Sequence, residues 1–203
     1  MRSGLCPPRR AKEPLAYSQL KFRITGVSPL VMHNSRLSNP LDRIAREIRN
    51  LSGKRKKTEA DLEEIARLEW FGSLYLDQGQ PCLPGEMLEA CITRGAMTKK
   101  RGKQAKAGIL CLGTFPLEYD GPRDPLELWK QEEFRLTAGV KGGNVRVIRT
   151  RPMFREWAAE IEVRYNPALL NADEVGQFLV AAGELEGLGD WRPRFGRFEV
   201  SRL

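Results

Sequence analysis

The chain has 203 residues, of which 41% are hydrophobic and 30% are charged, and its formal net charge is +8. This composition is typical of a folded protein with one sizeable core; it excludes a disordered chain and leaves little room for a second full domain. No run of about 18 apolar residues occurs, which excludes a membrane-spanning helix, and the excess of cations favours a polyanionic partner.

The start of the chain and its cysteines indicate the cellular setting. Residues 1–16 carry charges but no apolar segment, so we expect a flexible N-terminal arm rather than a secretory signal. The four cysteines lie far apart without a Cys-x-x-Cys pair, and the single histidine, His33, has no second imidazole to join it. We therefore expect reduced thiols, a cytoplasmic protein, and neither a metal nor a cofactor.

Apolar periodicity predicts the first elements. Residues 17–27 alternate apolar and polar side chains and are predicted to form a half-buried strand. Residues 40–72 then carry two helical stripes separated by a KRKK turn. Thr58 and Asp61 resemble a capping box at the start of the second stripe. The sequence thus predicts a helical hairpin inserted after the first strand.

The middle of the chain combines helix, loop and strand signals. A helix is expected after Pro84-Gly85, and the lysine-rich, glycine-punctuated segment 98–106 is predicted to be an unpacked basic loop. A strand is expected over residues 109–119. FRLTAGV and VRVIRTR flank KGGN and predict a β-hairpin.

The last third completes the fold prediction. A strand is expected over residues 157–165, then a helix capped by Asn171, and finally a closing strand. The order of these elements predicts a single α+β domain over residues 17–203. We expect a ferredoxin-like core of the modified RNA-recognition type, with the helical hairpin as an insertion.

Cations gather in two blocks that contain no acid, one from Arg94 to Lys106 and one over residues 141–155. Like charges gathered in this way repel one another, and a nucleic acid would relieve the repulsion, although lysine-rich loops also serve solubility. The candidate contacts in these blocks are Arg94, Lys99, Lys100, Arg101, Lys103, Lys106, Lys141, Arg146, Arg149 and Arg151.

The stretch GLGDWRPRFGRFEV, residues 187–200, combines glycines, arginines and aromatic residues. Glycines allow close backbone approach, arginines bind phosphates in a forked geometry, and aromatic rings stack on bases. Taken alone, the aromatic residues Trp191, Phe195 and Phe198 favour a place in the core, whereas the loop as a unit favours a binding role. The candidate contacts here are Gly187, Gly189, Trp191, Arg192, Arg194, Gly196 and Arg197.

Motifs for catalysis are missing from the sequence. It has no G-x-S-x-G, no G-x-x-x-x-G-K-[ST] and no arguable Cys–His pair, so no catalytic residue is predicted. Asp42, Asp77 and Asp190 are isolated acids that a fold could assemble around a metal ion, and Asp42 or Asp77 would serve in a metal-dependent RNase.

Three segments resemble the RAMP proteins, the crRNA-binding backbone subunits of CRISPR effector complexes. They are SPLVMHN (28–34), QPCLPGEMLEACITRG (80–95) and GLGDWRPRFGRFEV, in the family's order. The chain departs from the family pattern where Glu86 and Glu89 replace residues that approach RNA, and Asp42 is the only loose match to a cleavage residue. The pattern also looks like uncharacterised proteins of phage type.

The resemblance implies an RNA-binding protein of antiviral defence, a homo-oligomer or a subunit of a ribonucleoprotein complex, with no membrane partner. Together with the cation blocks, it predicts binding of single-stranded nucleic acid, preferably RNA, mainly through the phosphate backbone, by subunits repeated along the strand. Three alternatives stay open: a metal-dependent RNase of the RAMP type, a single-stranded DNA binding or annealing factor, and a protein–protein interaction module of phage origin.

Overall fold

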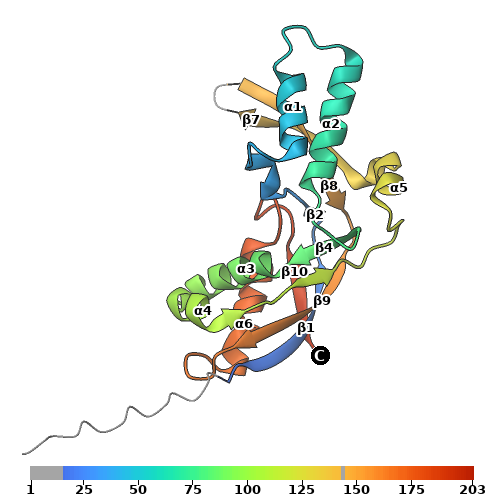
Figure 1. Cartoon of the computed structure of the whole chain (residues 1–203). Helices are drawn as coiled ribbons and strands as arrows, with labels where there is room; N and C mark the ends of the chain where they lie inside the picture. The colour runs from blue at the N-terminus through green and yellow to red at the C-terminus, as the bar shows by residue number, and fades with distance from the viewer. Residues whose placement is uncertain (1–15, 143–144) are drawn as a thin grey trace, which may run out of the picture.

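The computed structural model describes residues 16–142 and 145–203 and shows a mixed α+β protein with antiparallel sheets (Figure 1). The arm expected over residues 1–16 lies outside the described residues apart from Ala16, and so does the centre of the KGGN turn. No helix within the described ranges is long and apolar enough to cross a bilayer.

A four-stranded sheet forms the base of the molecule. Its order is β10 (Phe198–Arg202), β1 (Ser18–Gly26), β9 (Ala158–Tyr165) and β5 (Ile109–Leu110), and every neighbouring pair is antiparallel. The first predicted strand is confirmed, because alternate residues of β1 are buried as its pattern requires. The predicted strand 157–165 is confirmed in the same way by β9.

Two helices cover one face of this sheet. They are α3 (Gly85–Thr98) and α6 (Ala172–Ala181), and α6 continues as a π-helical turn over Ala182–Glu186. Their apolar residues join those of β1 and β9 in one core. Asn171 caps α6 as predicted, in a capping box with Glu174.

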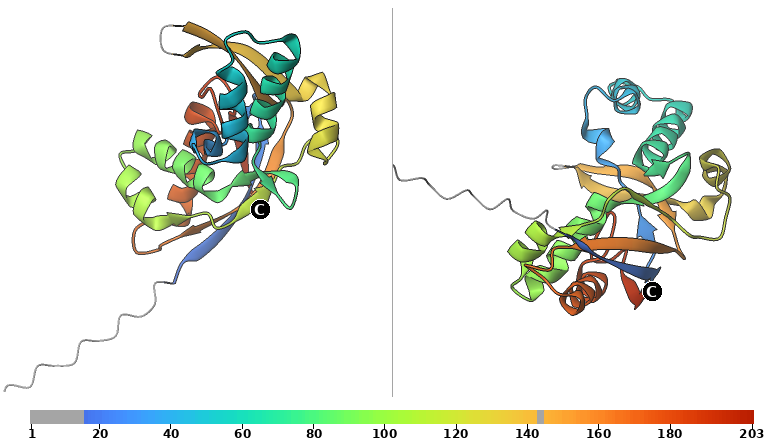
Figure 2. Two further views of the ribbon diagram at one scale, coloured as in Figure 1. Left: turned by 45° about the horizontal axis from the view of Figure 1, so that its top comes forward. Right: turned by 60° about the horizontal axis from the view of Figure 1, so that its bottom comes forward.

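The region predicted as an inserted hairpin contains α1 (Arg43–Ser52) and α2 (Glu59–Ser73), which pack against each other. The predicted box between Thr58 and Asp61 is present, since each side chain accepts a hydrogen bond from the other residue's backbone. Figures 1 and 2 show both helices at one end of the molecule, beside the hairpin of β7 (Arg135–Gly142) and β8 (Val145–Phe154). The side chain of Trp70 fixes α2 there, because its indole nitrogen donates to the carbonyl of Phe134 at 2.8 Å.

Segment 98–106 was predicted to be an unpacked loop, and that prediction is wrong. α3 runs to Thr98 and, after a short turn, α4 (Gly102–Gly108) follows. Ala105 is fully buried in the hydrophobic core, and the short helix packs against α3. Arg101 adds an ion pair of 2.8 Å with Glu174 of α6, a partner that local sequence does not reveal.

The strand expected over residues 109–119 is also broken. β5 ends at Leu110, and β6 (Thr114–Pro116) begins after Gly113, whose φ of 84° interrupts the extended backbone. β6 pairs with β4 (Gln80–Pro84), which in turn pairs with β3 (Leu76–Asp77). The remaining elements are β2 (Leu30–Val31), which pairs with β8, the short helices η1 (Ser35–Ser38) and η2 (Glu132–Phe134), and α5 (Pro125–Lys130).

The contact between α3 and α6 yields a stability prediction. A methyl group at Gly95 would lie 2.2 Å from the carbonyl oxygen of Phe178, whereas one at Gly176 would meet nothing closer than 3.9 Å. We expect Gly95→Ala to lower the free energy of unfolding by about 1–3 kcal/mol, because it forces the helices apart. The matched control Gly176→Ala should raise it by about 0.5–1 kcal/mol. Urea denaturation measures both, and equal effects would contradict the close approach.

Candidate functional site

Three segments that are distant in sequence meet at the start of α3. The terminal loop, residues 187–197 between the end of α6 and β10, lies along the segment that follows β1. The backbone N–H of Asp190 donates to the carbonyl of Val31 at 2.7 Å, and that of Gly196 donates to the carbonyl of Pro29 at 2.8 Å. Together with the first turns of α3 they surround a hollow of about 570 Å³. These are the three segments on which the resemblance to RAMP proteins rests.

Glycine conformation is what lets the terminal loop lie so close. Gly187, Gly189 and Gly196 have φ between 74° and 76°, a region that other residues rarely adopt. A side chain at Gly189 would lie 2.2 Å from the carbonyl oxygen of Val31, and one at Gly196 would lie 1.8 Å from that of Leu188. The glycines are therefore required by contacts within the chain.

The terminal loop divides its aromatic residues between core and surface. Phe198 is buried and packs against Trp157 with ring centroids 6.2 Å apart, so for this residue the core alternative is right. Trp191 and Phe195 are half-exposed, with their centroids 6.0 Å apart. Two flat rings on the surface of the loop form a surface on which bases can stack.

The arginines of this loop are exposed. The guanidinium group of Arg194 lies 5.7 Å from the ring centroid of Phe195, and Nε of Arg197 donates to the carbonyl of Pro193 at 2.8 Å. In the part of the chain that the structure describes, neither these two nor Arg192 has a carboxylate partner. Their charges remain available to a phosphate.

The hollow itself has mixed charge. Arg94 and Arg192 line it together with Glu86 and Asp190. Glu89, the second acid that departs from the family pattern, instead accepts a hydrogen bond of 2.7 Å from the backbone N–H of Cys111. Its carboxylate therefore supports the chain at the end of β5.

Arg149 and Arg151 were predicted to contact nucleic acid from the hairpin surface, yet both turn towards carboxylates. Arg149 pairs with Glu69 of α2, whose side chain also accepts from the backbone N–H of Thr150 at 3.1 Å. Arg151 is only 8% exposed and lies 3.6 Å from Asp190. Neither projects freely from the hairpin, whereas Arg146 on the same strand is exposed.

The predicted lysines form a second basic surface, which we call the lysine patch. It lies around the end of α3 and on α4, at the opposite end of α3 from the hollow, and its members are exposed. Arg101 is tied down in this region by Glu174 and by the carbonyl of Leu169. The side chain of Lys141 lies outside the described residues. The patch consists of Lys99, Lys100, Lys103 and Lys106.

The open face of the four-stranded sheet has a different character. RNA-recognition motifs stack bases on aromatic residues of this face. Here the outward side chains of β1, β9 and β10 include no aromatic residue, and some of the charged ones form ion pairs, as Arg23 does with Glu160 of β9 at 3.7 Å and with Glu118 at 2.6 Å. The open face of this sheet therefore offers no aromatic ring on which a base could stack.

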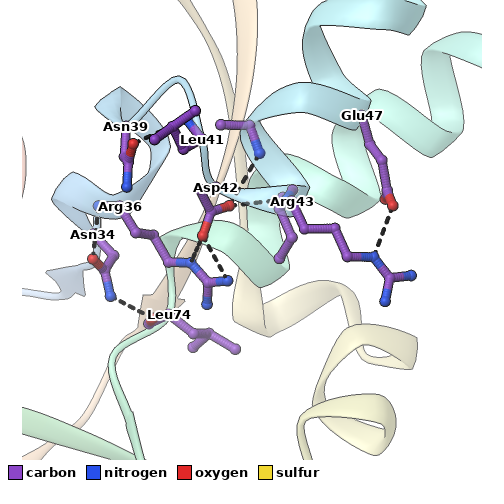
Figure 3. Close-up of polar contacts among 10 residues, drawn as sticks. Asn34, Arg36, Asn39, Leu41, Asp42, Arg43, Glu47 and Leu74 are labelled. Atoms are coloured by element: carbon purple, nitrogen blue, oxygen red, sulfur yellow. Dashed lines mark hydrogen bonds and ion pairs between the residues drawn. The ribbon is translucent and has the colours of Figure 1, made fainter.

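The three isolated acids have structural partners, and that of Asp190 is Arg151. Asp42 caps α1 by accepting from the backbone N–H groups of Ile44 and Ala45, and it pairs with Arg36 at 3.1 Å (Figure 3). Asp77 accepts from the hydroxyl of Thr114. Within residues 16–142 and 145–203, no group of three or more His, Cys, Asp or Glu side chains is placed to hold a metal ion.

The sequence matches no protein-family model and no curated protein.

Two residues that line the hollow, His33 and Tyr75, were not predicted as part of a site. The hydroxyl of Tyr75 donates to the carbonyl of His33 at 3.0 Å, which fixes the two walls relative to each other. Tyr75 sits in an ordinary strand-like run, LYLD, so nothing in its local sequence separates it from a core residue.

Titration of His33 should affect stability. Burial, and then the neighbouring charge of Arg151, hold the pKa of His33 below its usual 6.5; Arg149, Glu69 and Asp190 also face it. The unfolded chain therefore takes up a proton at a higher pH than the folded protein does. Stability is lost as the pH falls through 6.5 towards the folded pKa, with a slope of at most about 1.4 kcal/mol per pH unit.

Because His33 is the only histidine, His33→Gln should remove this component without affecting another imidazole. Urea unfolding between about pH 7.5 and pH 5.5 checks this. The variant should lose less stability over this range than the wild type. Equal losses of stability in both proteins would show that His33 takes up a proton as readily in the folded protein as in the unfolded chain.

Proposed function

We propose that this protein binds single-stranded nucleic acid, preferably RNA, along the terminal loop and the adjoining hollow. The observation that carries the proposal is the convergence of three distant segments, which brings Arg94, Arg192 and the ring of Trp191 to one region of the surface. Exposed arginines supply contacts to phosphates, and half-exposed rings supply sequence-tolerant stacking. The lysine patch at the other end of α3 extends the basic path.

We also propose that the core is ferredoxin-like and that the protein is a divergent relative of the RAMP superfamily. The main sheet supports this, because α3 lies between β1 and β5 in the chain, α6 lies between β9 and β10, and the spatial order is β10-β1-β9-β5. That arrangement is a β-α-β-β-α-β unit. The meeting of the three RAMP-like segments at one place is a second support.

Binding should depend on salt through specific arginines. The affinity for a uridine-rich oligonucleotide should fall steeply between about 50 and 200 mM salt, because bound cations displace counterions from phosphates. Arg94→Gln and Arg192→Gln should each weaken binding and reduce the salt slope by about 1. The control Arg202→Gln, on the edge strand β10, should change neither quantity.

Fluorescence anisotropy titrations at several salt concentrations give both the affinity and the slope. A flat salt dependence of the wild-type protein would reject contact led by phosphates. An effect of Arg202→Gln as large as that of Arg192→Gln would show that the nucleic acid binds elsewhere on the protein surface.

We propose further that copies assemble along the bound strand. The outer side of α2 exposes acids such as Glu59 and Glu63, and the lysine patch lies at the other end of the molecule (Figure 1). Complementary surfaces at opposite ends favour head-to-tail contacts, which can repeat without closing into a ring.

Analytical ultracentrifugation with short and long oligonucleotides tests this assembly. The mass of the complex should grow with strand length, and reversal of both acids in Glu59→Lys with Glu63→Lys should reduce that growth. Glu199→Lys, on the open sheet face, is the matched control. One protein per strand at every length would contradict the proposal.

A further inference from the structure

A second hollow, of about 340 Å³, lies next to the first and shares His33 with it. One wall is apolar and comes from η1 and α1, through Leu37, Ala45 and Ile48. The other wall is formed by Arg149 and Arg151 of β8 with Glu69 of α2. Its volume is at the lower end of the range typical of small-ligand sites.

The guanidinium group of Arg151 has few partners for so buried a cation. The residue is 8% exposed, Nη1 donates to the carbonyl of Thr150 at 3.4 Å, and Asp190 lies 3.6 Å away. No described residue gives Nε a hydrogen-bond acceptor, and the same holds for Nδ1 of His33. A guanidinium carries five N–H groups, and buried charges are normally hydrogen-bonded throughout. Both residues line the second hollow, so a ligand there lies beside two polar groups whose hydrogen bonding is incomplete.

The charges around this hollow decide the class of ligand. Arg149 and Arg151 are balanced by Glu69 and Asp190, and burial lowers the pKa of His33. A phosphate would bring net negative charge towards the buried carboxylate of Glu69, which costs free energy. A neutral, flat ligand with acceptors on one edge and donors on another fits better, because it can satisfy arginine and carboxylate together.

We propose that the second hollow takes a guanine base of the bound strand, an inference that rests on the proposed function. Guanine presents the acceptors O6 and N7 to the fork of an arginine, a pairing that adenine cannot offer because its N6 is a donor. Its N1–H and N2–H groups can donate to the carboxylate of Glu69. The side chains of Leu37 and Ile48 lie where they can contact a ring face. His33 lines both hollows, so this site adjoins the path proposed for the strand.

The experiment compares labelled uridine strands of about 12 nucleotides, within the site sizes of single-strand binders, that carry one central guanosine, adenosine or 7-deazaguanosine. The guanosine strand should bind about 5- to 150-fold more tightly than the adenosine strand. The 7-deazaguanosine strand should lose most of that advantage, since it lacks the N7 acceptor.

Two tryptophan substitutions test where the base binds. Ser38 is exposed at the rim of the second hollow, so Ser38→Trp covers the entrance without disturbing the core. It should abolish the preference for guanosine. Ser52→Trp, at the far end of α1, is the matched control and should retain the preference. Thermal melts verify that both variants are folded.

Each outcome is decisive. Tight binding of all strands without a preference for guanosine overturns this inference and leaves the proposed function standing. Absence of binding to any strand overturns both. A guanosine preference that survives Ser38→Trp would show that another surface reads the base.

Discussion

The pairing of the terminal loop with the segment after β1 is the constraint on which the rest of the structure depends. Backbone hydrogen bonds from Asp190 to Val31 and from Gly196 to Pro29 draw the two ends of the described chain together. They form only because glycines occupy positive φ where any side chain would meet a backbone carbonyl. This contact places the surface rings beside the start of α3 and sets Asp190 opposite β8.

A chain with this sheet cannot bind bases as RNA-recognition motifs do. Its open face consists of polar and charged side chains, several of them already paired with each other, and the half-exposed rings of Trp191 and Phe195 lie instead on a loop held by a rigid core. Loops positioned in this way are where proteins commonly carry their binding residues. The strand β8 links the four-stranded sheet to the helical pair α1–α2. It pairs with β2, which follows β1, and it carries the arginines that meet Glu69 of α2 and Asp190 of the terminal loop.

Ion pairs with distant segments explain why counting cations overestimates the basic surface. The second acid-free block holds five cations in sequence, but α2 supplies a carboxylate to Arg149 and the terminal loop supplies one to Arg151. The same is true of Arg101, which Glu174 neutralises. Among the predicted contacts whose side chains the structure describes, those without a carboxylate partner are Arg94, Arg146, the lysine patch and the arginines of the terminal loop.

The sequence by itself determined the local elements: the alternation in β1, the capping boxes at Thr58 and Asn171, and the β7–β8 hairpin all follow from side chains a few residues apart. Such signals are local because a strand's pleat and a helix's cap depend on neighbouring backbone groups. The helical segment at 102–108, the break in the strand near Gly113 and the pairing of Arg149 with Glu69, 80 residues away, were decided only by tertiary structure. Their stabilising partners come from distant segments, and a contact between such segments leaves no periodicity in a single sequence.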